Sequence, residues 1–369
     1  MNVTFWMHAL SPHKAPVIRE FARSHTVTVA TTNTFASDRI GLGWREAQID
    51  GVEWIRVTQP SDIHTLHARQ TSPSHINLVE GFRGFRFAER ILRELANDGS
   101  RIGIISERPD TRGWLGQARS LLYFSRYLLL RKDVDVVLAM STLGQTYFID
   151  RGWPAEKVFP YAYVTEGLSR LPRPCASNAR EFEMVYVGQF VHRKGGDILL
   201  RALATLDRPG WRCSFIGTGD MRKAWQAVST GLNISNHVEF LPPVDMNEIP
   251  KIISQCDLLV LPSRFDGWGA VVNEAIMAGV PVVCSSACGA RDLVNGSRGE
   301  VFDAGQVGDL AKALRRRIDA GPLASLERQQ LIDWARRIDG RSVAGYLTDI
   351  LGHIYDAGSR PQAPWLTQT

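Results

Sequence analysis

The chain has 369 residues, a formal net charge of +5 and a composition that is 44% hydrophobic and 22% charged. These values are typical of a globular protein with room for two domains, and they argue against disorder. No stretch is long and apolar enough to span a bilayer, and the first residues lack the basic start and apolar core of a signal peptide. The five cysteines include no Cys-x2-Cys pair, so we expect a reducing, cytoplasmic location and no zinc.

The first half of the chain alternates apolar segments with amphipathic ones. An apolar, aromatic strand at 2–8 is followed by an amphipathic helix at 17–22. Further strands are expected at 26–30, 53–57, 76–79, 101–106 and 134–140, and helices near 85–95 and 112–132. Strands that alternate with helices predict a mostly parallel, doubly wound sheet.

Residues 167–180 predict a linker, because they are rich in proline, serine and asparagine and have no periodicity. Beyond it the alternation restarts, with strands expected at 182–187, 214–216, 238–241, 258–261, 282–285 and 300–302. Helices are expected at 195–206, 221–232, 247–256, 268–278, 307–320, 324–337 and 342–356. The chain therefore predicts two α/β domains, 1–166 and 181–340, and a C-terminal helix and tail, 341–369, that packs back towards the first domain. A cleft is expected between the carboxyl ends of the two sheets.

A glycine-rich turn with basic residues, VGQFVHRKGG at 187–196, follows the strand at 182–187. Glycines let the backbone approach a ligand, and the start of a helix favours an anion, so Lys194 is a candidate phosphate contact. A plain turn with solvated basic residues is the alternative. The turn is not a Walker A loop, since Arg193 stands where its second glycine belongs.

Two other motifs are only weak evidence for a dinucleotide site or a metal site. Gly217 and Gly219 follow a strand as in a dinucleotide site, but Arg222 replaces the third glycine of that motif. Asp133 and Asp135 spell a D-x-D motif, yet it opens a strand at the domain surface, and we do not expect it to bind a metal.

Two carboxylates mark the stretch 258–294. Asp266 comes just after a strand, where open α/β sheets bind ligands, although it could equally cap the following helix. Glu274 is expected about two turns into an apolar helix, where a lone charge is costly. A structural ion pair is the alternative for Glu274.

The sequence around these two acids resembles the E-x7-E segment of family-four retaining glycosyltransferases, the glycosyl transferases group 1. The resemblance extends over Asp-Gly-Trp-Gly, Asn-Glu-Ala and Ala-Gly-Val-Pro-Val-Val. The turn at 187–196 is similar to the VGR-L-x3-KG segment of that family. This chain departs from the pattern twice, with Asp266 in place of the first glutamate and Gln189 in place of the arginine.

The resemblance implies the GT-B fold, which is two Rossmann-like, doubly wound parallel-sheet domains that face each other across a cleft. It also implies transfer of a sugar from a nucleotide-sugar with retention of configuration, and no metal or other cofactor. Lys194, with backbone amides near Gly188 and Gly269, would hold the donor diphosphate. Glu274 would hold the donor ribose, and Asp266 the hydroxyls of the donor sugar.

Further site residues follow from the same resemblance. In the first half, His13 lies in the turn after the first strand and Glu107 ends the fifth strand, and both are candidates for the reaction centre. In the second half the expected donor-binding residues are Gly188, Gln189, Arg193, Gly217, Gly219, Leu241, Pro242, Gly267, Trp268, Gly269, Gly289 and Arg291.

The expected function is a glycosyltransferase with a saccharide or lipid-linked saccharide acceptor, in surface polysaccharide or glycoconjugate synthesis. A non-catalytic nucleotide-sugar-binding subunit and a GT-B nucleotide-sugar epimerase remain as alternatives. Basic and aromatic residues alternate near 82–95 and 112–132, which indicates contact with an anionic membrane at its inner face, or simple packing with snorkelling arginines. No nucleic-acid-binding motif accompanies these basic residues, and no nucleic-acid partner is expected.

Overall fold

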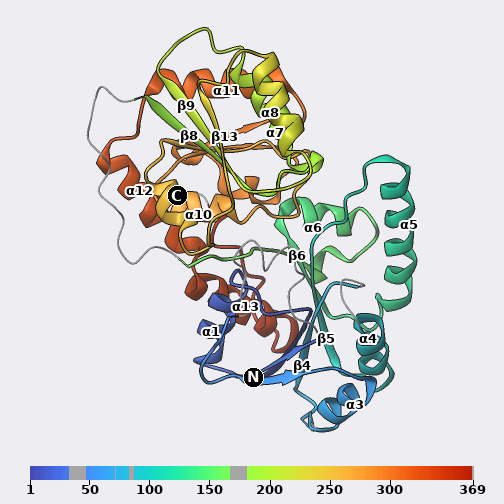
Figure 1. Cartoon of the computed structure of the whole chain (residues 1–369). Coiled ribbons are helices and arrows are strands. Elements are labelled where there is room, and N and C mark those ends of the chain that lie inside the picture. The colour runs from blue at the N-terminus through green and yellow to red at the C-terminus, as the bar shows by residue number, and fades with distance from the viewer. Residues whose placement is uncertain (33–46, 71, 83–86, 167–180, 368–369) are drawn as a thin grey trace. The chain divides into compact units, whose positions relative to one another are not determined.

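A computed structural model describes residues 1–32, 47–70, 72–82, 87–166 and 181–367 (Figure 1). The described residues form two compact units. The first contains residues up to Thr165 together with those from Ile338 on, and the second contains Glu166–Arg337. Each unit is built on its own parallel sheet.

The sheet of the first unit has the strand order β3-β2-β1-β4-β5-β6-β7, and every pair is parallel. The order reverses between β1 and β4, which are neighbours with Val3 beside Ile76. Ligands bind at such a reversal in open α/β sheets. The strands are β1 (Asn2–Met7), β2 (Thr26–Thr31), β3 (Glu53–Arg56), β4 (Ile76–Glu80), β5 (Arg101–Ser106), β6 (Val136–Met140) and β7 (Val158–Tyr161).

Helix α4 of the first unit buries its apolar face against this sheet. Its residues Ile91, Leu92 and Leu95 are at most 1% exposed and belong to the core. The last helix of the chain, α13, packs beside the first, α1 (Figure 1). The helices are α1 (Ala15–Ala22), α3 (Pro60–Ala68), α4 (Ala88–Asn97), α5 (Gly113–Leu130), α6 (Ser141–Ile149) and α13 (Gly340–Tyr355).

The sheet of the second unit has the strand order β10-β9-β8-β11-β12-β13, again with parallel pairs only. Its order reverses between β8 and β11. The strands are β8 (Phe182–Val187), β9 (Trp211–Ile216), β10 (Val238–Leu241), β11 (Leu258–Leu261), β12 (Val282–Ser285) and β13 (Gly299–Phe302). The α-helices are α7 (Gly196–Leu203), α8 (Arg222–Gly231), α9 (Ile249–Ser254), α10 (Val271–Met277), α11 (Val307–Ala320) and α12 (Ser325–Ala335).

The structure differs from the sequence predictions in several elements. Helices α3 and α6 and strand β7 are present but were not predicted. Helix α10 begins at Val271 rather than at 268, so Glu274 lies in its first turn and not two turns along it. The predicted linker at 167–180 lies outside the described residues. Among the described residues, no helix has both the length and the apolar character needed to cross a membrane.

Candidate functional site

The order reversal of the second sheet brings together two of the predicted site residues. Lys194 ends the short 3-10 turn His192–Lys194 after β8, and Asp266 follows β11. The Lys194 ammonium lies 2.5 Å from Oδ2 of Asp266, and both side chains are mostly buried. Ser263 Oγ lies 3.4 Å from the same carboxylate oxygen. A lysine and a carboxylate that are 72 positions apart in the sequence therefore form an ion pair at the order reversal, the point where open α/β sheets bind ligands.

Arg264 holds the turn that carries Lys194. Its guanidinium makes two hydrogen bonds to the carboxylate of Asp197, at 2.7 and 2.6 Å, and a third to the carbonyl of His192. Its backbone N–H donates to the carbonyl of Arg193 at 2.8 Å. Burial acts to raise the pKa of Asp197, but the hydrogen bonds and positive charge of Arg264, with smaller contributions from a backbone N–H and His192, together lower it. The pair therefore stays ionised and fixes the lysine turn against the end of β11.

The loop after β11 packs against the loop after β12. Asp266 forms a parallel bridge with Cys288, and its carbonyl accepts a hydrogen bond from the N–H of Gly289 at 3.1 Å. A Cβ at Gly289 would lie 2.2 Å from the carbonyl oxygen of Gly267, so glycine is needed for this approach. This contact explains Gly289 without a ligand, and it also fixes the direction of Asp266.

Arg222 occupies the position where a dinucleotide motif would have its third glycine. Its guanidinium donates to the carbonyls of Phe240 at 2.6 Å, Leu241 at 3.1 Å and Gly217 at 3.3 Å. It thereby ties the loop after β9 to the end of β10. The departure from the dinucleotide motif has a structural cause, because a glycine at this position could not make these bonds.

Glu274 is buried, with 8% of its surface exposed, in the first turn of α10. Burial raises the pKa of its carboxyl group to about 8. Among the described residues, no side chain forms an ion pair or hydrogen bond with this carboxyl, and the structural ion pair considered for it is not observed in that part of the chain. The alternative role of Asp266 as a helix N-cap is not observed either, since Ala270 is the N-cap of α10.

The other predicted donor residues line the same sheet edge. Gln189 accepts a hydrogen bond from the Tyr186 hydroxyl through its carbonyl, at 2.9 Å, and Arg193 is exposed. Trp268 is 1% exposed and its indole N–H donates to Asn273 at 2.8 Å, which is a core contact. Arg291 donates to the carbonyl of Ser286 at 3.1 Å.

The remaining predicted residues lie at the ends of strands or in the loops that follow them. Leu241 ends β10 and Pro242 follows it. The glycines of the loops after β8, β9 and β11 are Gly188, Gly217, Gly219, Gly267 and Gly269.

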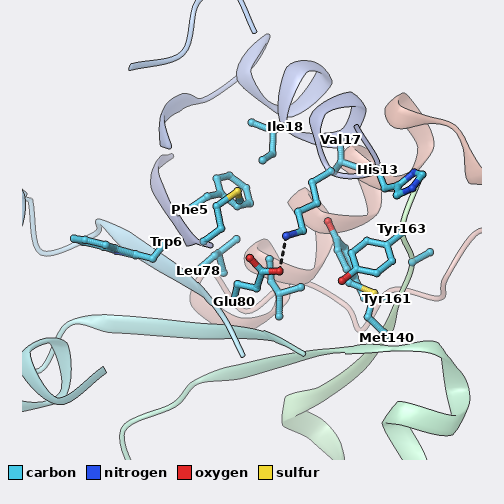
Figure 2. Close-up of a pocket in the computed structure, with 14 residues that line it drawn as sticks. Phe5, Trp6, His13, Val17, Ile18, Leu78, Glu80, Met140, Tyr161 and Tyr163 are labelled. Carbon is cyan, nitrogen blue, oxygen red and sulfur yellow. Dashed lines mark hydrogen bonds and ion pairs between the residues drawn. The ribbon is translucent and has the colours of Figure 1, made fainter. Parts of the chain in front are cut away.

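The first unit has its own pocket, at the ends of β1 and β4, and His13 lines it (Figure 2). At its centre the Lys14 ammonium pairs with Oε1 of Glu80, and the other oxygen of Glu80 accepts a hydrogen bond from the N–H of His8 at 3.0 Å. Glu107 follows β5 and is exposed. It does not line this pocket.

Lys14, Glu80, Asp197, Arg222 and Arg264 were not identified from the sequence. Glu80 and Arg264 could have been identified from the sequence. Each comes at or just after the end of a strand that borders the point where the strand order of its sheet reverses. Asp135 of the D-x-D motif instead accepts hydrogen bonds from the N–H of Ile102 and the hydroxyl of Tyr355, both at 3.0 Å, a structural role. Among the described residues, no cluster of three or more His, Cys, Asp or Glu side chains could hold a metal ion.

Comparison with protein families gives a match to the model described as glycosyl transferases group 1, over residues 170–337. Residues 170–337 belong to this glycosyltransferase family. The match covers most of the second unit, including Lys194, Asp266 and Glu274. The family resemblance expected from those residues is confirmed.

The relatives of similar sequence are also described as glycosyltransferases. A GDP-mannose-dependent alpha-(1-6)-phosphatidylinositol monomannoside mannosyltransferase of Mycolicibacterium smegmatis is 28% identical over 278 residues, 68% of this chain and 71% of that protein. A D-inositol 3-phosphate glycosyltransferase of the same organism is 31% identical over 166 residues, 42% of this chain. The alignments span only 38% of the latter protein and 29% of an uncharacterized glycosyltransferase of Methanocaldococcus jannaschii.

Solved structures confirm the fold class. The apo form of a lipopolysaccharide outer core galactosyltransferase, WaaB, superposes with a TM-score of 0.70 at 18% identity, over 95% of this chain and 99% of that one. Anabaena HepE, solved with UDP and glucose, superposes with a TM-score of 0.71 at 19% identity, over 95% and 99% of the two chains. The chain therefore has the GT-B fold, with two Rossmann-like parallel sheets.

Proposed function

We propose that the protein is a retaining glycosyltransferase that moves a sugar from a nucleotide-sugar to a saccharide or lipid-linked saccharide, in surface polysaccharide or glycoconjugate synthesis. The observation that carries the proposal is the pairing of Lys194 with Asp266 at the order reversal of the second sheet. The family of residues 170–337 supports it. UDP and glucose in the HepE structure support a nucleotide-sugar as the donor.

The pair suggests how the donor is used. Negative charge grows on the diphosphate as the bond to the sugar breaks, and a fixed ammonium stabilises that charge. Lys194 supplies the ammonium, together with backbone N–H groups near Gly188 and Gly269. A diphosphate that takes the ammonium releases Asp266 to accept hydrogen bonds from sugar hydroxyls. The ribose hydroxyls would donate to Glu274, and no metal is needed in this scheme.

Turnover is tested by incubating the protein with UDP-, GDP- and ADP-sugars, with and without saccharide acceptors, and following nucleotide release by NMR. We expect release that an acceptor accelerates, that EDTA leaves unchanged, and a product that keeps the anomeric configuration of the donor. Donor binding without release would instead favour the nucleotide-sugar-binding subunit. A change in the sugar itself, without transfer, would favour the epimerase.

Lys194→Ala tests the site itself. Loss of the ammonium should lower turnover at least about tenfold, because a charge-assisted contact to the leaving group is removed. Lys251→Ala is the matched control, since Lys251 lies in an exposed pair with Glu248. Turnover of Lys194→Ala equal to that of the control would remove Lys194 from the mechanism.

We also propose that the protein binds the inner face of an anionic membrane and that α5 makes the contact. This helix exposes six large apolar side chains, each 46–77% exposed: Trp114, Leu115, Leu121, Leu122, Leu128 and Leu129. They form three adjacent pairs that repeat every seven residues, so they follow one line along the helix. The opposite side packs inward, with Gly116 buried and Phe124 against the core.

Charge favours a membrane as the partner of this apolar line. The segment 112–132 has five basic residues and no acidic one. Two copies of α5 that packed together would bring basic residues near each other, whereas anionic lipid would attract them. Helix α4 was expected to join this contact. Its described apolar side chains lie in the core and Arg90 pairs with Glu94, so the proposal rests on α5.

A further inference from the structure

Two ion pairs join the segment after β8 to the segment after β11. The first is the pair of Lys194 and Asp266. The second is the pair of Arg264 and Asp197. Each segment supplies one cation and one anion, so the two pairs run in opposite directions between the same two segments. Loss of one pair therefore leaves the other in place.

The Arg264 pair is the more rigid of the two. Two nitrogens of its planar guanidinium donate to the two carboxylate oxygens of Asp197, at 2.7 and 2.6 Å. Nη1 also donates to the carbonyl of His192 at 2.9 Å, in the lysine turn, His192–Lys194. Lys194 instead ends in a point charge on a flexible stem. An anionic ligand can therefore take the Lys194 ammonium from its partner more readily than it can open the bidentate pair.

The lysine turn depends on the loop after β11 for its position. The turn has only three residues, and Arg264 and Phe265 both donate a backbone N–H to the carbonyl of Arg193, at 2.8 and 3.4 Å. Gly195 follows the turn with a φ of 69°, and a Cβ there would clash with the carbonyl oxygen of Pro262. A change that moves the turn away from this loop also moves the ammonium that the turn carries.

We infer that Arg264 is a positioning residue, which with Asp197 keeps the lysine turn at the end of β11 while a donor breaks the pair of Lys194 and Asp266. In the free protein both pairs hold the two segments. When a diphosphate takes the ammonium, the Arg264 pair remains and keeps the ammonium at the leaving group, where a fixed charge stabilises the growing negative charge. The inference rests on the proposed function, because it assumes that a donor diphosphate takes the ammonium.

A double-mutant cycle tests whether Arg264 acts through Lys194. Arg264→Gln removes the charge of the guanidinium, and turnover should fall about tenfold, as it should when the ammonium itself is removed. Arg264→Gln added to Lys194→Ala should cost no more than about a further twofold, since the ammonium that Arg264 positions is already absent. Losses that multiply, to about a hundredfold in the double variant, would overturn the inference.

Affinity for a nucleoside diphosphate gives a second readout that needs no sugar. UDP, GDP and ADP are titrated by calorimetry into the wild type and the same variants. Arg264→Gln should weaken the tightest of the three about tenfold, and should weaken it little further in the Lys194→Ala background. Asp197 lies in the first turn of α7, and a pair that only stabilised this helix would lower the thermal unfolding temperature and leave the affinity unchanged. That result would also overturn the inference.

Arg316→Gln is the matched control, because Arg316 makes two hydrogen bonds to Glu300 in the same unit. It should change neither turnover nor diphosphate affinity, and losses as large as those of Arg264→Gln would overturn the inference. Asp197→Asn provides a second route if Arg264→Gln does not fold. It removes the other charge of the pair, so its cycle with Lys194→Ala should give the same result, and losses that multiply would again overturn the inference.

The proposed function and this inference fail in different ways. A wild-type protein that neither binds the three diphosphates nor releases nucleotide from a nucleotide-sugar would overturn the proposed function, and the inference with it. An active wild-type protein whose variants show losses that multiply would overturn the inference alone.

Discussion

Under the proposed function, Asp266 and the donor diphosphate compete for the ammonium of Lys194. Asp266→Asn keeps the shape of the side chain and removes its charge, so a nucleoside diphosphate alone should bind more tightly, by about tenfold. Turnover should fall by at least about tenfold, since the amide is a poorer acceptor for sugar hydroxyls. Calorimetric titration of UDP, GDP and ADP, together with steady-state kinetics, checks both changes.

Ser263→Ala is the control for this variant, because Ser263 touches the same carboxylate oxygen only at 3.4 Å. Its affinity for the diphosphates should stay close to that of the wild type. Unchanged diphosphate affinity in Asp266→Asn would mean that the carboxylate does not compete for the ammonium.

Glu274 makes the stability of the second unit depend on pH. Its pKa is about 8 in the folded chain against 4.5 in the unfolded one, so between these values the folded state holds a proton that the unfolded state has lost. The free energy of unfolding therefore contains a contribution that is present below pH 4.5 and is lost as the pH rises to 8. Over this range the loss is roughly 5 kcal/mol at 1.36 kcal/mol per unit.

Glu274→Gln should remove this dependence. Urea denaturation of both proteins at pH 5 and pH 8 should show the wild type losing stability relative to the variant as the pH rises. Because a ribose diol would bind the ionised carboxylate, nucleotide affinity measured above pH 8 should fall in the variant. A variant that is less stable than the wild type at pH 8 would mean that the carboxylate has a structural partner.

The charged groups of the second site could be predicted from the sequence only where they lie within a motif. Lys194 and Asp266 each follow a strand in a glycine-containing turn, and the family pattern marks both. Arg222 and Arg264 bind backbone carbonyls of segments distant in the sequence, and no local pattern indicates such a partner. The Lys14–Glu80 pair was missed for the same reason, since 66 positions separate its members.

Among the helices, α5 allows a direct test of membrane contact. Leu121→Glu places a charge in the middle of its exposed apolar line, so the protein should no longer float with vesicles rich in anionic lipid. Leu326→Glu is the matched control, because Leu326 is equally exposed, at 71% against 69%, but lies in α12. Wild-type protein that stays unbound while forming a dimer through α5 would support self-association in place of the membrane.

The elements that escaped prediction share a weak sequence pattern. Strand β7 reads Val-Phe-Pro-Tyr, and its proline argues against a strand, although an edge position tolerates it. Helix α6, STLGQTYFI, starts directly after the buried strand β6 and has no clear polar face, so it resembles an extension of the apolar run. The strands with β-branched, apolar sequences were predicted to within a few residues.

At the scale of the whole molecule, the first unit depends on the last helix of the chain. Helix α13 buries Val343, Tyr346, Leu347, Ile350 and Leu351. At about 1.5–3 kcal/mol for each large side chain, this contribution is comparable with the whole stability of a typical domain, about 5–15 kcal/mol. The local pattern predicts the helix, but its partner α1 lies at the other end of the sequence.

Two glycines of α13 test this packing. A Cβ at Gly340 would lie 2.7 Å from the carbonyl oxygen of Pro16 at the start of α1, whereas Gly345 faces open space. Gly340→Ala should lower the free energy of unfolding, by about 1–3 kcal/mol as for an overpacked site. Gly345→Ala should raise it by up to about 1 kcal/mol, since alanine favours a helix. Equal effects in thermal unfolding would mean that α13 does not pack here as described.

The discontinuous first unit has a consequence for biosynthesis. Glu166–Arg337 emerge from the ribosome before α13 (Gly340–Tyr355), so for the short time in which α13 is synthesised the second unit has its whole sequence available while the first still lacks this helix. Because domains generally fold as units during synthesis, the second should reach its native state before the first, against the order of the chain. Until α13 has emerged, the side of α1 that it covers stays exposed, and a nascent chain stalled before α13 should recruit chaperones that a chain containing α13 does not.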